Sequence, residues 1–320
     1  MVKRKLRKMK SKYIIIIFFI LFCNPSKASD KITVMLDWFI NPDHAPLYIA
    51  YENGYFENEN ISVEFIVPAD PNDPPKLAAA KKIDIAISYQ PQLHMQVDQG
   101  LPLIRVGTLI ATPLNCLLVL NDSKIKNISD LKGKKIGYSV GGFEDTLLKT
   151  LLNSQNLLLS DVELINVNFS LSPALISKKV DAVIGAFRNF ELNQLEILNK
   201  KGKAFFVEEH GVPPYDELIF VTHKDNLKNK NLIKFLRAVE KGTHYLINHP
   251  NKSWELFIKN RSELNDQLNK KAWFDTIPRF ALRPAGLDQN RYEKFAKYLY
   301  KEKSISKALN WREYAVQLEQ

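Results

Sequence analysis

An acidic and aromatic corner near the amino-terminal end carries side chains suited to binding a small molecule. Residues 31–36 have the pattern of a strand, and Asp37 and Trp38 follow it directly, ahead of an Asn-Pro-Asp turn at 41–43. In an open α/β sheet ligands bind at the carboxyl ends of the strands, so this corner is expected to lie over the pocket. A carboxylate accepts hydrogen bonds and an indole offers a flat apolar face. The pair therefore predicts a recognition site for a flat small molecule.

A second candidate contact lies at a glycine pair, Gly141 and Gly142, which follows a strand pattern and opens a helix pattern within 139–145. Backbone N–H groups at the start of a helix can hold a carboxylate, a phosphate or a hydroxyl group, and glycine permits close approach. The same pair is also typical of a plain turn. The sequence leaves these two interpretations of the segment open.

The elements that must position these groups alternate between strand and helix patterns. Strand patterns occupy 61–67, 83–88, 134–139, 162–168 and 180–187, and helix patterns occupy 73–82, about 143–154 and 173–179. Helices between strands at this spacing favour parallel sheets with crossover helices. The alternation is interrupted once and then resumes, which predicts two α/β units.

Two apolar stretches, at 113–133 and 204–223, are placed to carry the chain from one unit to the other and back. The chain would then form a discontinuous first lobe of residues 29–114 and 216–320, with a second lobe of residues 115–215. Helical patterns at 232–247 and 290–303 are expected to pack on the first lobe.

The predicted fold class is therefore α/β, with two lobes that each contain a mostly parallel sheet flanked by helices. Two hinge strands join the lobes. Such an arrangement can open and close around a ligand, as in periplasmic binding proteins of type II.

The first 28 residues have the pattern of a bacterial secretory signal. Residues 1–12 carry seven Lys and Arg and no acid, an apolar run follows at 13–23, and a small-x-small site ends at Ala28. The apolar run is shorter than the ~20 residues that a membrane-spanning helix needs. Lipid attachment at Cys23 is disfavoured by the bulky Phe22 before it. We therefore expect export to the periplasm with cleavage near Ala28.

The charge balance argues against a nucleic-acid partner. Removing residues 1–28 takes away eight basic residues and no acidic one, so the formal net charge falls from +10 to +2. Cys116 is then the one remaining cysteine, which excludes an internal disulfide. Core burial must supply the stability, and roughly 290 residues can bury two modest cores.

Several segments of this chain resemble the substrate-binding proteins of transporters for thiamine pyrimidine precursors. They are the corner and helix at 31–56, GKKIGY at 133–138 with the glycine pair after it, KVDAVIG at 179–185 and the Asn-Phe-Glu triplet at 189–191. These proteins share a superfamily with the sulfonate- and nitrate-binding proteins and the fungal pyrimidine synthase. The resemblance covers about 31–300. It implies a monomeric binding protein that delivers a pyrimidine to an ABC permease and its ATPase.

The resemblance also implies a ligand slot. Trp38 would provide one face for a stacked aminopyrimidine, and Tyr89 or another aromatic residue would oppose it. Glu191 would carry specificity, because a carboxylate accepts hydrogen bonds from an exocyclic amino group and from a protonated ring nitrogen. The alternative interpretations are an ordinary buried aromatic for Trp38 and a solvated charge at the start of a helix over 188–200 for Glu191.

Other residues share the predicted site on the same basis. The resemblance places His44 at the mouth, where it would exchange a hydrogen bond with a ligand hydroxyl or formyl group. Asn189 would either cap its helix or reach the ligand. The remaining candidates are Asn41, Tyr48 and Phe187.

Two positions depart from the family's pattern. Related pyrimidine binders tend to carry an acid in a Ser-Tyr-x-Pro-Gln motif and an aromatic residue before the Asn-aromatic-Glu triplet, where this chain has Gln90 and Arg188. If both face inward, the pocket tolerates negative charge, and a phosphorylated, carboxylated or sulfonated ligand stays among the predictions. Arg188 can equally point to solvent.

The sequence does not favour an enzyme. The fungal synthase uses its own lysine, a histidine and a cysteine-rich iron site, whereas the corresponding segments here, 85–94 and 212–223, lack lysine and cysteine respectively. HExxH, P-loop and CxxC patterns are absent. We expect binding without catalytic residues, metal or cofactor. The alternatives are a binder of a sulfonate, nitrate or riboflavin-like ligand and, from a different class, a secreted pyrimidine synthase.

Overall fold

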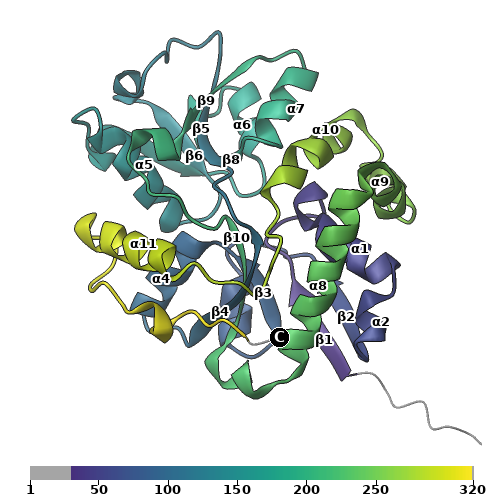
Figure 1. The fold of residues 1–320 in the computed structure, drawn as a ribbon. Helices are drawn as coiled ribbons and strands as arrows, with labels where there is room; N and C mark the ends of the chain where they lie inside the picture. Colours follow the sequence, from purple (N-terminus) through teal and green to yellow (C-terminus); the bar gives the residue numbers. More distant parts are fainter. Residues whose placement is uncertain (1–29, 319–320) are drawn as a thin grey trace, which may run out of the picture.

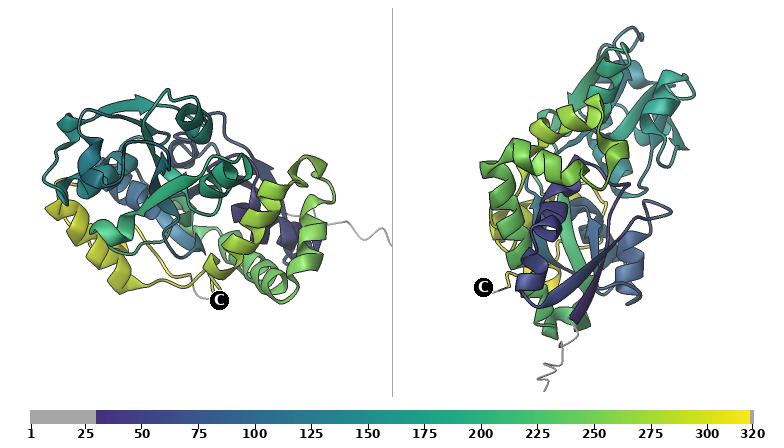
Figure 2. Two further views of the ribbon diagram at one scale, coloured as in Figure 1. Left: turned by 90° about the horizontal axis from the view of Figure 1, so that it is seen from above. Right: turned by 90° about the vertical axis from the view of Figure 1, so that its right-hand side faces the viewer.

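The computed structural model describes residues 30–318, and the predicted leader with its cleavage site and Cys23 lies outside the described residues. The described chain forms two five-stranded sheets with helices on their faces (Figure 1). We call residues 30–114 with 216–318 the first lobe and residues 115–215 the second lobe. This division remains a prediction. The two lobes lie against each other in all three ribbon views (Figures 1 and 2).

Each lobe contributes one sheet. The first sheet has the order β2-β1-β3-β10-β4, from β2 (Ile61–Ile66), β1 (Asp30–Met35), β3 (Ile85–Ser88), β10 (Leu218–His223) and β4 (Leu103–Ile110). The second has the order β7-β6-β8-β5-β9, from β7 (Glu163–Asn166), β6 (Lys135–Tyr138), β8 (Ala182–Phe187), β5 (Asn115–Leu120) and β9 (Gly202–Phe206).

One reversed strand in each sheet explains why the sheets are mixed. β10 pairs antiparallel with both its neighbours, as does β5, whereas β1 with β2 and β3, and β6 with β7 and β8, pair in parallel. Each reversed strand directly follows a crossing between the lobes. The Glu217 carboxylate accepts hydrogen bonds from the N–H groups of Leu114 (2.5 Å) and Asn115 (2.9 Å), so the two crossings lie side by side. The predicted fold of two mostly parallel sheets with two hinge segments is confirmed.

Alternating side chains bury both faces of the first sheet. In β10, Leu218 and Phe220 belong to the cluster that includes α8 (Asn231–Asn248), whereas Ile219 and Val221 belong to a second cluster that includes Tyr292 of α11 (Gln289–Lys301). A strand with an apolar side chain at every position needs cover on both sides, which the helices supply. The other helices of the first lobe are α1 (Ala45–Glu52), α2 (Tyr55–Asn58), α3 (Pro74–Ala79), α4 (Gln90–Asp98), α9 (Pro250–Ile258) and α10 (Gln267–Thr276). The second lobe has α5 (Phe143–Asn153), α6 (Leu171–Ile176) and α7 (Glu191–Ile197).

The close contact between α1 and α8 requires a glycine. A Cβ atom built on Gly242 in α8 would lie 2.4 Å from the carbonyl oxygen of Pro46 and 2.9 Å from the backbone nitrogen of Ala50. The two helices therefore approach backbone to backbone, which fixes the segment after the first strand against the carboxyl-terminal half of the chain.

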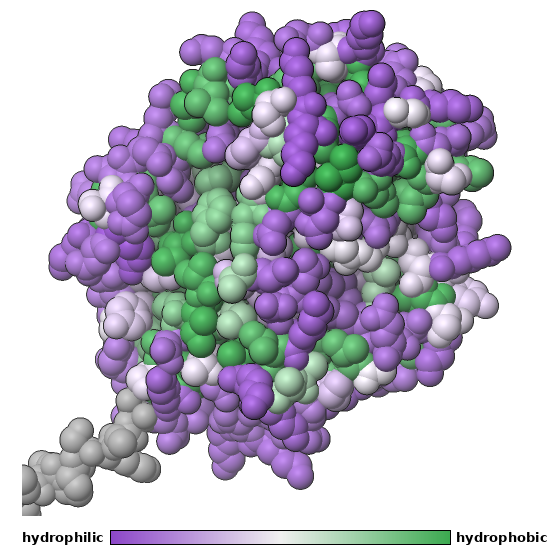
Figure 3. All heavy atoms as spheres, turned by 180° about the vertical axis from the view of Figure 1, so that it is seen from behind, coloured by the Kyte–Doolittle hydropathy of each residue, from purple (hydrophilic) through white to green (hydrophobic). Residues whose placement is uncertain are grey.

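Most predicted elements lie within a few residues of those observed. The pattern at 188–200 is an exception, since α7 begins at Glu191 after a turn at 188–190. Within residues 30–318 no helix has the length and apolar character needed to cross a membrane. On the face opposite to Figure 1, a band of hydrophobic residues runs between hydrophilic side chains (Figure 3).

Candidate ligand-binding site

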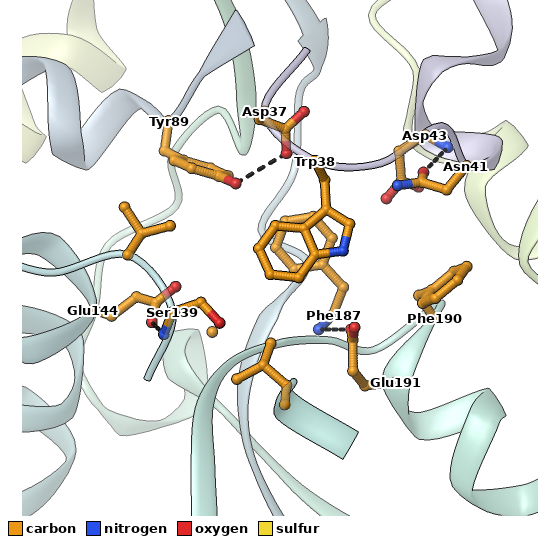
Figure 4. A pocket seen from close by; sticks show the side chains of 13 residues that line it. Asp37, Trp38, Asn41, Asp43, Tyr89, Ser139, Glu144, Phe187, Phe190 and Glu191 are labelled. Atoms are coloured by element: carbon orange, nitrogen blue, oxygen red, sulfur yellow. Dashed lines mark hydrogen bonds between the residues drawn. The ribbon is translucent and has the colours of Figure 1, made fainter. Parts of the chain in front are cut away.

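A pocket lies between the two lobes and encloses about 430 Å³ of empty space, including the part open to solvent. It is formed where strands end, because Asp37 follows β1, Tyr89 follows β3, Ser139 follows β6 and Phe187 ends β8. The carboxyl ends of the strands thus meet at the pocket, as expected for this class of sheet. The lining residues are Asp37, Trp38, Asn41, Asp43 and Tyr89 from the first lobe and Ser139, Val140, Glu144, Leu171, Gly185, Phe187, Phe190 and Glu191 from the second (Figure 4).

The Asp37 carboxylate is held from two sides. Its Oδ1 lies 2.9 Å from Nε2 of His44, and its Oδ2 accepts a hydrogen bond from the Tyr89 hydroxyl at 2.9 Å. The Asn41 N–H donates to Nδ1 of His44 (3.4 Å), so a neutral ring carries its proton on Nε2 and donates it to Asp37. His44 is fully buried and does not line the pocket. Its ring therefore lies behind Asp37, and its contact with a ligand stays a prediction.

The turn after Trp38 places a second carboxyl group in the pocket. Asn41 caps the short helix η1 (Pro42–His44), and its Oδ1 accepts from the Asp43 N–H at 2.8 Å. Asp43 accepts hydrogen bonds from Nδ2 of Asn189 (2.6 Å) and from the Thr276 hydroxyl (3.0 Å). Burial raises the pKa of Asp43 from 3.8 to about 6.

Glu191 opens α7 with its carboxyl group beneath Trp38 (Figure 4). One carboxyl oxygen accepts the N–H of Phe187 at 2.7 Å, which holds the side chain against the end of β8. Burial raises the pKa of Glu191 from 4.5 to about 7. Trp38 and Glu191 therefore face the same cavity from different lobes, as the resemblance implied.

Glu144 is a buried carboxyl group that the sequence did not mark as a contact. Its Oε2 accepts from the N–H of Ser139 at 2.9 Å, and burial holds its pKa well above the ordinary value. Gly185 makes room for it, because a Cβ at that position would lie 2.3 Å from Oε1 of Glu144. Gly185 also has φ of +91°, which favours glycine.

Neither departure from the family's pattern brings positive charge into the pocket. Arg188 forms a bidentate pair with Glu208 at 2.7 and 2.8 Å, and its guanidinium carbon lies 4.0 Å from the centre of the Phe206 ring. Oε1 of Gln90 accepts the N–H of Asp216 at 2.8 Å, away from the lining. Among the described lining residues there are four carboxyl groups and no Lys, Arg or His.

The aromatic side chains form a partial slot. Trp38 contacts Phe169 edge to face, with ring centres 4.5 Å apart, and Tyr89 stacks on Phe143 at 4.9 Å. Trp38, Tyr89 and Phe187 all line the pocket as predicted, and Phe190 adds a ring from the triplet. The expectation that Tyr89 lies opposite Trp38, on the other side of a bound ligand, stays a prediction.

Four further predicted contacts do not line the pocket. Tyr48 is buried in the core, with the Arg261 guanidinium 4.1 Å from its ring centre. The N–H of Gly141 donates to Asn72 at 3.1 Å, and the N–H of Gly142 donates to Asp145 at 3.3 Å. Nδ2 of Asn189 donates to Asp43 and bridges the lobes, while its Oδ1 is buried without a hydrogen-bond partner among the described residues. None of the four lies on the pocket wall, and their contact with a ligand stays a prediction.

Most of the lining residues that were not predicted lie inside motifs that the sequence analysis had already marked. Asp43 belongs to the turn at 41–43, Phe190 to the triplet, and Ser139, Val140 and Glu144 to the glycine segment, so each lay inside a marked motif. Gly185 ends the segment at 179–185 that carries part of the resemblance, whereas Leu171 lay outside every marked motif.

Comparison with known proteins gives consistent family matches. Residues 41–253 match the profile of the family described as NMT1/THI5 like. A Haemophilus influenzae protein, assigned by its name provisionally to thiamine biosynthesis, is 55% identical over 296 residues, which cover 92% of this chain and 94% of that protein. The formylaminopyrimidine-binding protein of Halalkalibacterium halodurans is 32% identical over 256 residues, 78% of each chain.

More distant matches extend to enzymes and to solved structures. A 4-amino-5-hydroxymethyl-2-methylpyrimidine phosphate synthase of Saccharomyces cerevisiae is 27% identical over 258 residues, 77% of this chain and 76% of that protein. The alkanesulfonate-binding protein SsuA of Xanthomonas axonopodis superposes with a TM-score of 0.71 at 13% identity, covering 90% of this chain and 98% of that one. The structural match shows a shared fold.

Proposed function

The chain belongs to the NMT1/THI5-like family, and on that premise we propose that it is the exported binding component of an ABC importer for a thiamine pyrimidine precursor. The ligand would be a hydroxymethyl- or formylaminomethyl-aminopyrimidine held between the lobes. The name of the 32%-identical relative and the shared fold of an importer's binding protein support this proposal.

The charge of the pocket is the observation that carries the proposal. Four carboxyl groups converge there, and the described lining offers no cation to balance an anionic ligand. A sulfonate, nitrate or phosphate would find no cation in that described lining, and its charge would further disfavour ionisation of carboxyl groups whose pKa burial already raises. An aminopyrimidine instead brings N–H donors and a basic ring nitrogen, which carboxyl groups accept.

Each decisive group has a defined part in this proposal. Trp38 stacks on the pyrimidine, which adds ~0.5–1.5 kcal/mol beyond the buried area. Glu191 accepts from the exocyclic amino group, while Asp37, held by His44 and Tyr89, presents a fixed acceptor on the first lobe. Binding would therefore require both lobes.

A synthase is the second candidate, because a synthase is among the relatives. The segments at 85–94 and 212–223 lack the lysine and the cysteines of the fungal enzyme. We favour a binding protein without catalytic activity, and a turnover assay distinguishes it from a synthase. The purified protein incubated with pyridoxal or aminopyrimidine compounds would release product only if the synthase proposal is correct.

A thermal-shift panel on the chain from residue 29 onward tests the ligand class. It compares the two pyrimidine precursors with thiamine, riboflavin, nitrate and an alkanesulfonate. A ligand at 100 times its Kd adds ~2.7 kcal/mol to stability, so a true ligand gives a clear rise in Tm. We expect a rise with the pyrimidines. A rise with the alkanesulfonate or nitrate alone would refute the proposed ligand.

A further inference from the structure

Three asparagine side chains cross between the lobes outside the pocket lining. Asn72 of the first lobe donates to the carbonyl of Ser139 (3.3 Å) and accepts from the N–H of Gly141 (3.1 Å). Asn189 of the second lobe donates to Asp43 at 2.6 Å. Asn193, one turn further along, donates to Asp275 of α10 at 2.7 Å.

These contacts are preorganised by neighbours. Asp70 accepts both the backbone N–H of Asn72 (2.8 Å) and its Nδ2 group (2.9 Å), which fixes the amide before it meets the second lobe. Asn193 also donates to the carbonyl of Asn189 at 2.8 Å, so the two asparagines of the second lobe form one unit. The amides of Asn72 and Asn193 are thus held in position by their own lobes.

The contacts adjoin the pocket without entering it. Asn189 and Asn193 lie two residues before and after Glu191, and Asn72 bonds to the backbone of Ser139, which lines the cavity. Closing the lobes onto these partners therefore brings Glu191 and the glycine segment into place. Ligand recognition and lobe contact share the same short segments of the second lobe.

Amides suit contacts that must form and break. A neutral carboxamide loses less hydration on burial than an ionised group, so opening and closing carry a small penalty. A hydrogen bond of this type is worth roughly two- to tenfold in an equilibrium constant. Three of them are enough to favour closure without making it irreversible.

We propose that Asn72, Asn189 and Asn193 form a closing lock that sets the closed fraction of the protein. This inference rests on the proposed binding function. A ligand that needs the closed form binds with an apparent Kd equal to its intrinsic Kd divided by that fraction. The lock residues therefore act as positioning residues, raising affinity and residence time for every ligand by the same factor.

The pair Asn193 and Asp275 gives the sharpest test, since Asp275 is exposed and its truncation spares the core. We compare Asn193→Ala, Asp275→Ala and the double variant, together with Asn72→Ala. The matched control is Asn53→Ala, because the Asn53 amide bonds to Ile49 within its own helix. Affinity for both pyrimidines is measured by calorimetry, and dissociation by stopped-flow tryptophan fluorescence.

We expect each lock variant to lose roughly two- to tenfold in affinity for both ligands, with their ratio unchanged and dissociation faster. The double variant should lose no more affinity than the weaker-binding single variant, because both single substitutions remove the same hydrogen bond between Asn193 and Asp275. Asn53→Ala should match the unsubstituted chain. Additive losses at 193 and 275, or a changed ligand ratio, would overturn the lock.

Closure itself is measured by fluorescence transfer between dyes at Lys82→Cys and Lys179→Cys, which are exposed positions on different lobes. Cys116 is fully buried, so the dyes should react only with the two introduced cysteines. The Asn72→Ala, Asn193→Ala double variant should show a smaller closed population. Identical populations in the variant and the parent, with and without ligand, would overturn the proposal. If no pyrimidine binds the parent protein, the proposed function fails, and the ligand-free populations alone decide the lock.

Discussion

Substitutions of Glu191 should change binding and folding stability in opposite directions. The carboxyl group is buried, accepts one hydrogen bond from Phe187 and has its pKa raised by burial from 4.5 to about 7. A raised carboxyl pKa means that the native state prefers the protonated form. The associated stability is fully present below pH 4.5 and is lost as the pH rises through 7.

The magnitude follows from that shift. Each pKa unit corresponds to about 1.4 kcal/mol, so ionised Glu191 destabilises the ligand-free protein on the order of 3 kcal/mol above pH 7. Glu191→Gln keeps an oxygen for the Phe187 N–H and cannot ionise. We expect its free energy of unfolding at pH 8 to equal or exceed that of the parent, with the two converging near pH 4.5.

Binding should respond the other way. Glu191→Ala removes every acceptor that this side chain offers to the ligand, and we expect at least a tenfold weaker affinity, about 1.4 kcal/mol. Urea unfolding between pH 4.5 and 8 measures stability, and titration calorimetry measures affinity. Unchanged affinity in Glu191→Ala would remove the residue from the site. A Glu191→Gln protein less stable than the parent at pH 8 would refute the burial argument.

Three further substitutions test other parts of the site. Trp38→Ala should weaken pyrimidine binding at least tenfold by calorimetry, about 1.4 kcal/mol, whereas unchanged affinity would leave Trp38 an ordinary buried aromatic. Gly185→Ala should lower the free energy of unfolding, measured in urea, by ~1–3 kcal/mol. The control is Gly100→Ala, because Gly100 has the same φ of +91° but no atom within 4 Å of the added Cβ, so its loss should be smaller. Equal losses would contradict the contact with Glu144. Arg188→Ala should leave the salt dependence of ligand affinity unchanged, because its charge is paired with Glu208; a steeper or lost dependence would place Arg188 at the ligand.

The sequence was most informative where one short segment determines its own geometry. The strand before Asp37 and the change to helix after it fix a strand-end corner, so the pocket position of Trp38 could be predicted locally. The same segment could not show that His44 points behind Asp37, because the orientation depends on one turn of a three-residue helix.

Contacts between distant segments account for most of what was missed. Glu144 occupies space left by Gly185, forty-one positions later, and neither residue reveals the other in the sequence. Asn189 donates to Asp43 and to Thr276 of the other lobe, and no local pattern in the sequence links these three residues. Such pairings arise from tertiary packing and not from local pattern.

The reversed strand β10 also constrains the order in which the molecule can assemble. It lies between β3 and β4, so β4 cannot join the other strands of the first sheet until the chain beyond residue 217 is available. The strands of the second sheet, by contrast, come from one continuous stretch that precedes β10. During synthesis the second lobe can therefore complete its sheet first, while β3 and β4 of the first lobe still lack the strand that joins them. Because long-range pairings of this kind slow folding, we expect the first lobe to complete its sheet later than the second.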